Sequence, residues 1–375
     1  AKQLSLYCDF LMKAGFRAKN DDQIEEELKK VINVFRCVSN KLVFQYEYVK
    51  KLSERMLTNR TVSIIAEKNL VSKLKADQGV QYVNRMTSIF EDLEKSISTV
   101  DKFRMLKHKG IPDGVSFNCQ ILQNGAWEID RMREYKLDIN TLSPKLKFCK
   151  EEWETFYKNL HNAHNLIWVF GAGNLEIETT YLQKRLNITM TVLQYIMLIY
   201  IEKKDKQFKV SDLAGLIDVD EQNVINDLNS LLYNQVFNKN RQANQGIITA
   251  DVEGGKEITL DSTVGINKSF NPQNMKLNVV TTMMKKGKGE AEDKMKDEMI
   301  IKNSQNFVLD AFITRIMKGR ISKDTTHLEL VNETARQIEL FVAQPLQIKQ
   351  RIEALIEKGI IKRKEGTYDH YEYIS

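Results

Sequence analysis

The first 111 residues contain no proline and repeat apolar side chains at the spacing of an α-helix. Apolar residues recur every three or four positions, and glutamate and lysine fill the opposite face. One stripe comprises Ile24, Leu28, Val31, Ile32, Phe35 and Val38, and a second comprises Val83, Met86, Phe90, Leu93 and Ile97. Because proline interrupts helices, this stretch predicts a helical bundle over residues 1–110.

The pattern changes after Gly110. Residues 111–114 read Ile-Pro-Asp-Gly, which is a turn signal, and residues 115–122 then alternate in the manner of a strand. The sequence next predicts a helix at 144–160 and short strands at 165–169 and 174–179. We therefore expect a mixed α/β domain over residues 111–284.

Helical spacing returns at residues 189–236, within that domain. Val210 could open one short helix, and Asp220 or Glu221 could cap the next. Three short helices of this kind are typical of a winged-helix unit, so we predict a winged-helix-like insert at about 189–240. Strand-like segments follow at 247–250, 258–260 and 275–280.

Residues 285–296 are dense in charge and contain two glycines, a composition typical of a linker. Beyond it, helices are predicted at 298–318, 328–340 and 345–358, followed by a β-hairpin at 360–374. Three helices closed by a hairpin describe a winged-helix domain, which we place at 297–375. The predicted fold class is therefore α+β and multidomain, with a helical bundle, a mixed α/β domain and a C-terminal winged helix.

Composition limits the classes of function. The net charge of +6 is spread along the chain, so it is too diffuse to indicate nucleic acid by itself. The longest apolar run, at 195–201, is too short to span a bilayer. The four cysteines show no CxxC pair, which favours reduced thiols over disulfides or a zinc site: Cys8, Cys37, Cys119 and Cys149. Because the chain begins Ala-Lys-Gln, without a signal peptide, we expect a fragment of a longer protein of the cytoplasm and nucleus.

Motifs for catalysis or metal binding are weak. His161 and His164 have the spacing of a metal pair, but no carboxylate or cysteine partner is evident nearby, so a structural role is favoured. Gly171 and Gly173 resemble half of a phosphate-binding loop without the third glycine, and a plain turn is the better interpretation. No catalytic triad or paired-carboxylate site stands out. The sequence therefore predicts no catalytic residues and no metal site.

The last domain carries the most specific resemblance. Residues 313–318, Ile-Thr-Arg-Ile-Met-Lys, closely resemble the modification motif of the cullin family. Phe341, Pro345 and the closing 371–375 segment also match the cullin C-terminus. Further similar blocks occur in the same order along nearly the whole chain, at 41–57, 74–92, 117–127 and 156–168.

The sequence departs from the family pattern at several places. Glu128 follows Trp127 where the family usually has proline, and His164 stands where arginine is usual. Ile321 replaces a common basic residue after Arg320, and Ile360 replaces a frequent tyrosine.

The resemblance implies a non-catalytic scaffold of a cullin-RING ubiquitin ligase. In the family, a strand of a RING-box protein joins the α/β sheet, and its RING positions a ubiquitin-conjugating enzyme. Zinc is then expected only in the RING-box partner, with no cofactor in this chain. The receiving sheet would include 115–122, 166–169, 174–179 and 275–280. Candidate contacts to the RING-box protein are Val115, Phe117, Cys119, Ile121, Trp127 and Trp168.

The resemblance also implies that Lys318 accepts a ubiquitin-like modifier, the reaction called neddylation. Further implied partners are the conjugating and removing machinery of this modifier and a cullin-exchange factor. Helix geometry permits this role, because Val308, Leu309, Phe312 and Ile316 share one side and Lys318 points away from it. Gly319 is a plausible helix end. The residues that support the motif are Arg315, Ile316, Met317 and Arg320.

A DNA-binding winged-helix regulator is the alternative. Its third helix would carry Lys349, Arg351 and Lys358. These basic residues are interleaved with glutamine and glutamate, and base-stacking aromatic residues are missing. Nucleic-acid binding is therefore the less favoured interpretation.

Overall fold

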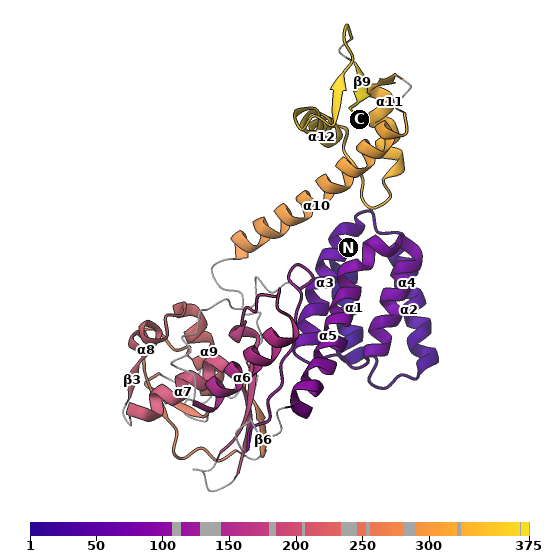
Figure 1. The fold of residues 1–375 in the computed structure, drawn as a ribbon. Coiled ribbons are helices and arrows are strands. Elements are labelled where there is room, and N and C mark those ends of the chain that lie inside the picture. The colour runs from indigo at the N-terminus through magenta and orange to yellow at the C-terminus, as the bar shows by residue number, and fades with distance from the viewer. Residues whose placement is uncertain are drawn as a thin grey trace. The chain divides into compact units, whose positions relative to one another are not determined.

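The computed structural model describes residues 1–375 except 107–113, 128–143, 180–184, 205–206, 234–245, 253–255, 273, 281–289, 321–323, 368 and 375. The chain divides into two compact units (Figure 1). Unit 1 comprises Ala1–Glu91, Leu122–Trp127 and Lys288–Ser375, and unit 2 comprises Asp92–Ile121 and Glu128–Gly287.

The N-terminal part of unit 1 is helical, as predicted. Its elements are α1 (Lys2–Phe10), a π-helical turn (Leu11–Gly15), α2 (Asp21–Arg36), α3 (Lys41–Leu57), α4 (Ile64–Gln78) and the first part of α5 (Val80–Leu106). Polar side chains start three of these helices by accepting a backbone N–H of the first turn: Asn20, Asn40 and Ser63. Phe35, Phe44 and Tyr48 pack ring against ring in the bundle core, where Phe44 and Tyr48 stack at 5.6 Å.

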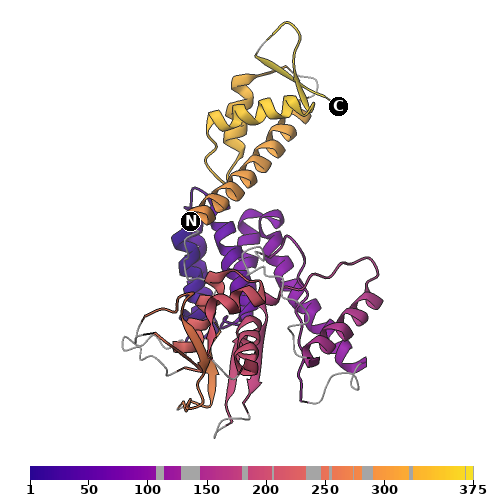
Figure 2. The same ribbon diagram turned by 90° about the vertical axis from the view of Figure 1, so that its left-hand side faces the viewer.

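The C-terminal part of unit 1 has the predicted winged-helix elements (Figures 1 and 2). They are α10 (Glu290–Lys318), β7 (Thr325–Thr326), α11 (His327–Gln337), α12 (Pro345–Glu357), β8 (Ile361–Arg363) and β9 (His370–Tyr373). The three strands form a sheet in the order β7-β9-β8. Gly366 has φ of +82°, as the predicted hairpin turn requires.

Helix α10 begins at Glu290, eight residues earlier than predicted, so the second half of the predicted linker is helical. Residues 285–289 lie outside the described residues. Apolar residues of α10 form the centre of the terminal core together with α11, α12 and the hairpin: Leu309, Ile313, Ile316, Met317, Leu330, Ile348, Ile352, Leu355, Ile361 and Tyr371.

Unit 2 contains the second part of α5, α6 (Pro144–Leu160) and a three-stranded sheet. The strands are β1 (Asn174–Glu178), β2 (Asn187–Thr191) and β6 (Lys276–Asn278), in the order β1-β2-β6. The pair β1 and β2 is antiparallel, and β2 and β6 are parallel. The buried Gln194 joins the C-terminal ends of the neighbouring strands β2 and β6, since it accepts from Thr191 N at 2.8 Å and donates to Val279 O at 2.8 Å.

The predicted insert is also built of three helices and a small sheet. The helices are α7 (Val192–Lys204), α8 (Val210–Ile217) and α9 (Glu221–Tyr233), and the strands are β3 (Phe208–Lys209), β4 (Ile248–Ala250) and β5 (Thr263–Ile266). The sheet order is β3-β5-β4, with antiparallel pairs. Three helices with a three-stranded antiparallel sheet are the elements expected of a winged-helix-like unit.

Three strand predictions are wrong. Residues 115–122, 165–169 and 258–260 form no strand ladder with any described residue. Four strands were not predicted, β2, β3, β5 and β7, and two of them, β2 and β5, occupy the interior of their sheets. The predicted receiving sheet is therefore not one continuous ladder, because only 174–178 and 276–278 belong to it.

Candidate modification site and partner-binding surface

Lys318 is the last residue of α10 and its side chain is exposed. The residues just before it, Ile316 and Met317, are 6% and 1% exposed and belong to the terminal core. Successive helix residues are rotated by about 100°, so burying this pair directs Lys318 away from the core. The prediction that Lys318 points into solvent is confirmed.

The helix end after Lys318 is set by backbone hydrogen bonds. The N–H of Gly319 donates to Arg315 O at 3.0 Å, and the N–H of Arg320 donates to Met317 O at 3.0 Å. Gly319 is not among the residues with positive φ. The predicted end is therefore at the right residue, but it does not depend on the left-handed conformation that glycine favours. Arg320 is half-buried, and Ile321 lies outside the described residues.

Arg315 is exposed yet held in place. Its Nη2 donates to Gln337 Oε1 at 2.9 Å, and its guanidinium lies 4.9 Å from the centre of the Phe312 ring. Gln337 in turn donates through Nε2 to Glu333 Oε1 at 2.6 Å. Sequence reasoning did not find this arrangement, because Gln337 and Glu333 lie on a different helix, α11.

The segment 115–121, in which burial alternates as in an extended strand, carries four of the predicted partner-binding residues. Burial alternates along it, with even-numbered side chains exposed and odd-numbered ones half-buried. Three of the odd residues pack on an aromatic cluster formed by α5 and α6: Phe117, Cys119 and Ile121. The cluster consists of Val100, Phe103, Trp153, Phe156 and Tyr157, and its burial of Cys119 raises the pKa of that thiol to about 12. Val115 is half-buried in the same segment.

Two side chains of α5 hold one edge of this extended segment. Ser96 Oγ accepts from Ile121 N at 2.8 Å, and its single hydroxyl proton is shared between Asp92 O at 2.7 Å and Ile121 O at 3.1 Å. Arg104 Nη2 donates to Phe117 O at 3.3 Å. In extended backbone, the N–H and C=O groups of alternate residues point to opposite edges. The backbone groups of Asn118 and Gln120 therefore point away from α5, and this edge enters no ladder with any described residue.

Trp168 packs against the same cluster. Its Nε1 donates to Glu154 Oε1 at 2.7 Å, its ring stacks on Phe170, and Lys150 Nζ lies 5.6 Å from its centre. Burial opposes ionisation of Glu154, but hydrogen bonds from Lys150 and Trp168 outweigh it and lower the pKa of that carboxyl. These contacts fix the orientation of the half-buried Trp168 ring.

The other predicted contacts have a different outcome. Trp127 is buried and belongs to unit 1, whereas the other predicted contacts belong to unit 2. Glu128 lies outside the described residues. Sequence reasoning missed Ser96, Arg104 and Phe103. The spacing of Val100 and Phe103 continues the helical stripe and could have indicated a core role for Phe103, whereas the bonding of Ser96 and Arg104 has no sequence signal.

His161 and His164 follow the end of α6, and their rings stack at 4.8 Å. Tyr157 Oη and His164 Nδ1 are hydrogen bonded at 3.1 Å. In the described part of the chain, no three histidine, cysteine or acidic side chains gather in a way that could hold a metal ion.

Gly171 lies in a short 3-10 turn, Phe170–Ala172, as predicted. No described helix is both long and apolar enough for a membrane span.

Most basic side chains at α12 and in the hairpin are paired with carboxylates of the same domain, whereas Lys349 on α12 is exposed and forms no ion pair with a described residue. Arg351 forms a two-pronged ion pair with Asp310, at 2.7 Å for both contacts. The other pairs are Lys358 with Asp310, Arg363 with Glu353, Lys362 with Glu372 and Lys364 with Asp324. A helix that reads DNA needs cations directed at phosphates and bases, so these pairs weigh against the DNA-binding alternative.

Comparison with known proteins gives three successive family matches. Residues 1–99 match the cullin alpha solenoid domain, residues 121–270 the cullin alpha+beta domain, and residues 304–367 the cullin protein neddylation domain. Lys318 lies within the third match. The matched regions leave only short gaps and together cover most of the chain.

Relatives that align with essentially the whole of this chain agree with these matches. Cullin-1 of Caenorhabditis elegans is 28% identical over 100% of this chain, Cullin-3 of Dictyostelium discoideum 25% over 99%, and Cullin-4A of Mus musculus 23% over 100%. The chain spans 46%, 50% and 47% of these relatives, which is about half of their length.

One solved structure, titled "A Dual E3 Mechanism for Rub1 Ligation to Cdc53: Dcn1(P)-Cdc53(WHB)", has a chain that is 27% identical to this one. The match covers 24% of this chain and 100% of that chain, with a TM-score of 0.21. The ordered family matches and the relatives that align with essentially the whole of this chain lead to one conclusion: the chain belongs to the cullin family and carries its alpha solenoid, alpha+beta and neddylation domains.

Proposed function

We propose that this chain is the part of a cullin-RING ubiquitin ligase scaffold that accepts a ubiquitin-like modifier and holds a RING-box protein. The observation that carries the proposal is the exposed Lys318 at the end of α10, directly after two core residues and inside the match to the neddylation domain. The scaffold has no catalytic residues of its own. Its contribution to rate is to hold a charged conjugating enzyme close to a substrate.

The accepting step needs only an accessible amine. The uncharged Nζ of Lys318 attacks the carbonyl carbon of the thioester that joins the modifier to its conjugating enzyme. A C–N bond forms, the C–S bond breaks, the enzyme's thiolate leaves, and the amine's extra proton passes to solvent. A buried lysine could not reach a thioester, which is why the exposure of Lys318 matters.

The open edge of 115–121 supports the second part of the proposal. A strand of the RING-box protein would add to this edge by backbone hydrogen bonds with Asn118 and Gln120, a mode known as β-augmentation. Phe117, Cys119 and Ile121 anchor the segment on the aromatic cluster, and Ser96 and Arg104 hold its opposite edge. Zinc would then belong to the RING-box protein, and the conjugating enzyme would bind through the RING. The modifier's conjugating and removing machinery and a cullin-exchange factor complete the proposed partners.

Replacing Asn118 with proline is expected to weaken binding of a RING-box protein about tenfold. Proline removes the N–H that faces the open edge, and a lost ladder bond contributes about 0.5–1.5 kcal/mol, where 1.4 kcal/mol corresponds to about tenfold in affinity. The side chain of Asn118 is exposed, so the fold itself loses little. The measurement is the dissociation constant for a co-purified or added RING-box protein, with zinc content as a second readout.

Asn118→Ala is the matched control, because alanine keeps the N–H. It is expected to bind within about twofold of the wild type. Equal weakening by both substitutions would show that the side chain, and not the backbone edge, is recognised. Failure of the wild-type chain to bind any RING-box protein would contradict this part of the proposal.

The DNA-binding alternative predicts that the chain shifts duplex DNA, whereas our proposal predicts that it does not. Because Arg351, Lys358 and Arg363 are paired with carboxylates, we expect no shift of duplex DNA even at low salt, where phosphate contacts are strongest. A salt-dependent shift with a defined complex would instead support the alternative.

A further inference from the structure

Within the segment 313–318, burial separates the residues into two groups. Ile313, Ile316 and Met317 are at most 6% exposed and serve the core. Arg315 and Lys318 are exposed. Residues three positions apart on a helix are neighbours on its surface, with Cβ atoms about 5–6 Å apart. A protein that approaches Lys318 therefore meets Arg315 beside it.

Arg315 is also restrained more than an exposed arginine usually is. Its guanidinium is hydrogen bonded to Gln337 and lies near the ring of Phe312. The side-chain amide of Gln337 is itself held by a hydrogen bond to Glu333. A surface side chain held in one geometry loses less conformational freedom when a partner binds it.

The charge of Arg315 is not cancelled by a direct ion pair. Its hydrogen-bond partner Gln337 is a neutral amide, and within the described residues no carboxylate forms a salt bridge with it. In this respect it differs from Arg351 and Arg363, each of which has a carboxylate partner in the same domain. Arg315 thus offers an oriented cation with donors left for a second partner.

We propose that Arg315 is a specificity-determining residue, which binds a carboxylate on the enzyme that transfers the modifier to Lys318. The inference rests on the proposed function of Lys318 and adds the group that directs the enzyme to it. A guanidinium suits a carboxylate because two parallel N–H groups can bind its two oxygens, which a lysine ammonium cannot reproduce. The side chains at 316 and 317 contribute to the motif only by building the core that orients Arg315 and Lys318.

The test is the steady-state kinetics of modification, with the chain as the varied substrate and the modifier loaded on its conjugating enzyme. Arg315→Gln is expected to raise KM about tenfold or more while kcat stays within about twofold, because the charged contact is lost and the accepting amine is unchanged. Arg315→Lys is expected to recover only a small part of this loss. Gln337→Ala leaves the guanidinium in place but unrestrained, and an intermediate rise in KM is expected.

Arg336→Gln is the matched control, since Arg336 is an exposed arginine of the same domain. It is expected to keep the wild-type KM. Thermal unfolding of each variant separates recognition from folding, and the midpoints of Arg315→Gln and wild type should agree closely.

The outcomes are distinguishable. A wild-type chain that is not modified at Lys318 contradicts the proposed function. Modification of wild type at Lys318 with an unchanged KM for Arg315→Gln overturns only the role of Arg315. A fall in kcat together with a lower unfolding midpoint for Arg315→Gln also overturns that role, because it assigns Arg315 to stability alone.

Discussion

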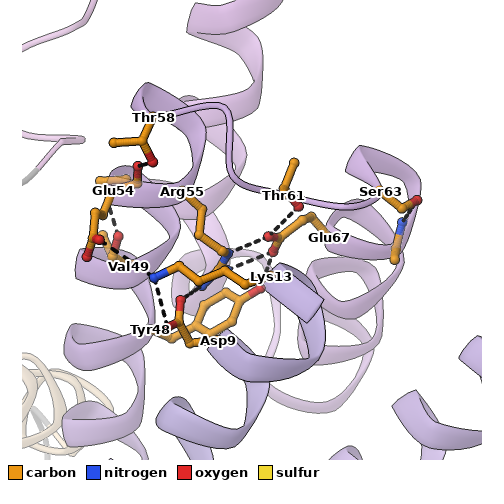
Figure 3. A network of polar contacts seen from close by, with 12 residues as sticks. Asp9, Lys13, Tyr48, Val49, Glu54, Arg55, Thr58, Thr61, Ser63 and Glu67 are labelled. Carbon is orange, nitrogen blue, oxygen red and sulfur yellow. Dashed lines mark hydrogen bonds and ion pairs between the residues drawn. The ribbon is translucent and has the colours of Figure 1, made fainter. Parts of the chain in front are cut away.

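Arg55→Met is expected to lower the free energy of unfolding of the helical bundle by about 3–5 kcal/mol. Arg55 on α3 and Glu67 on α4 are both 0% exposed and form a two-pronged ion pair, from Nε to Oε1 at 2.6 Å and from Nη2 to Oε2 at 2.9 Å. Figure 3 shows the two side chains at the centre of a polar network. Methionine fills a similar volume but leaves the carboxylate of Glu67 without its cation.

The remaining contacts of the network cannot replace that cation. Tyr48 Oη donates to Glu67 at 2.8 Å and Thr61 Oγ1 donates at 3.1 Å, but both donors are neutral. Asp9 accepts from Arg55 Nη1 at 2.7 Å but keeps its ion pair with Lys13 at 3.0 Å, so the uncompensated charge is that of Glu67. Burial opposes the charge on Arg55, yet Glu67, Tyr48 and Asp9 outweigh this and raise the pKa of the guanidinium. The native state therefore depends on the pair being complete.

Arg36→Met provides the control. Arg36 forms an ion pair with Asp77 at 2.7 Å, but its side chain is 62% exposed. Solvent-exposed pairs contribute about 0.2–1 kcal/mol, so this variant should stay close to wild type. The measurement is urea unfolding followed by far-UV circular dichroism, with hydrogen exchange in α3 and α4 to localise the change.

A double variant, Arg55→Met with Glu67→Met, should be more stable than Arg55→Met alone, because an apolar pair leaves no buried charge. Equal stability of Arg55→Met and Arg36→Met would contradict the account of this network.

Helices were the most predictable part of the fold, because their signals are local. The predicted helix at 144–160 coincides with α6, which begins at a proline in its first turn. Helix α10 was placed too late, since the charges and glycines of 285–296 were interpreted as a linker. From Glu290 onward, acidic and basic residues at helical spacing support a helix instead.

Strands were harder to predict, because a strand exists only with a partner. The alternation at 115–122 was real, since burial alternates along the segment, but no described residue pairs with it. Strand β2 was missed because Ile188 and Met190 stand directly before the helical stripe of α7. Which short segments pair is decided by contacts distant in sequence.

At the candidate site too, local features could be predicted from the sequence, and features set by contacts distant in sequence could not. The exposure of Lys318 followed from rotation along one helix, and the structure confirms it. The restraint on Arg315 required Gln337, which is 22 positions away. Likewise, the edge held by Ser96 could not be predicted from residues 115–121 alone.

Lys318→Arg is expected to abolish attachment of the modifier. Arginine keeps the positive charge and has a similar helix propensity, so the terminal core and the electrostatic potential at the domain surface should not change. The guanidinium stays protonated at any ordinary pH, and it cannot act as the nucleophile that attacks a thioester. The loss should therefore be complete rather than partial, and the unfolding midpoint should equal that of the wild type.

Lys302→Arg is the matched control, because Lys302 is an exposed lysine on the same helix. This variant should accept the modifier at the wild-type rate. Modification that continues on Lys318→Arg but stops on Lys302→Arg would show that Lys302, and not Lys318, is the accepting lysine of α10.

The most direct measurement of the central claim is intact-mass analysis with peptide mapping after incubation of the chain, a RING-box protein and the modifier cascade. We expect one modifier on the wild-type chain, joined by an isopeptide bond to Lys318, and none on Lys318→Arg. Equal modification of the two chains, or a wild-type linkage mapped to another lysine, would contradict the central claim.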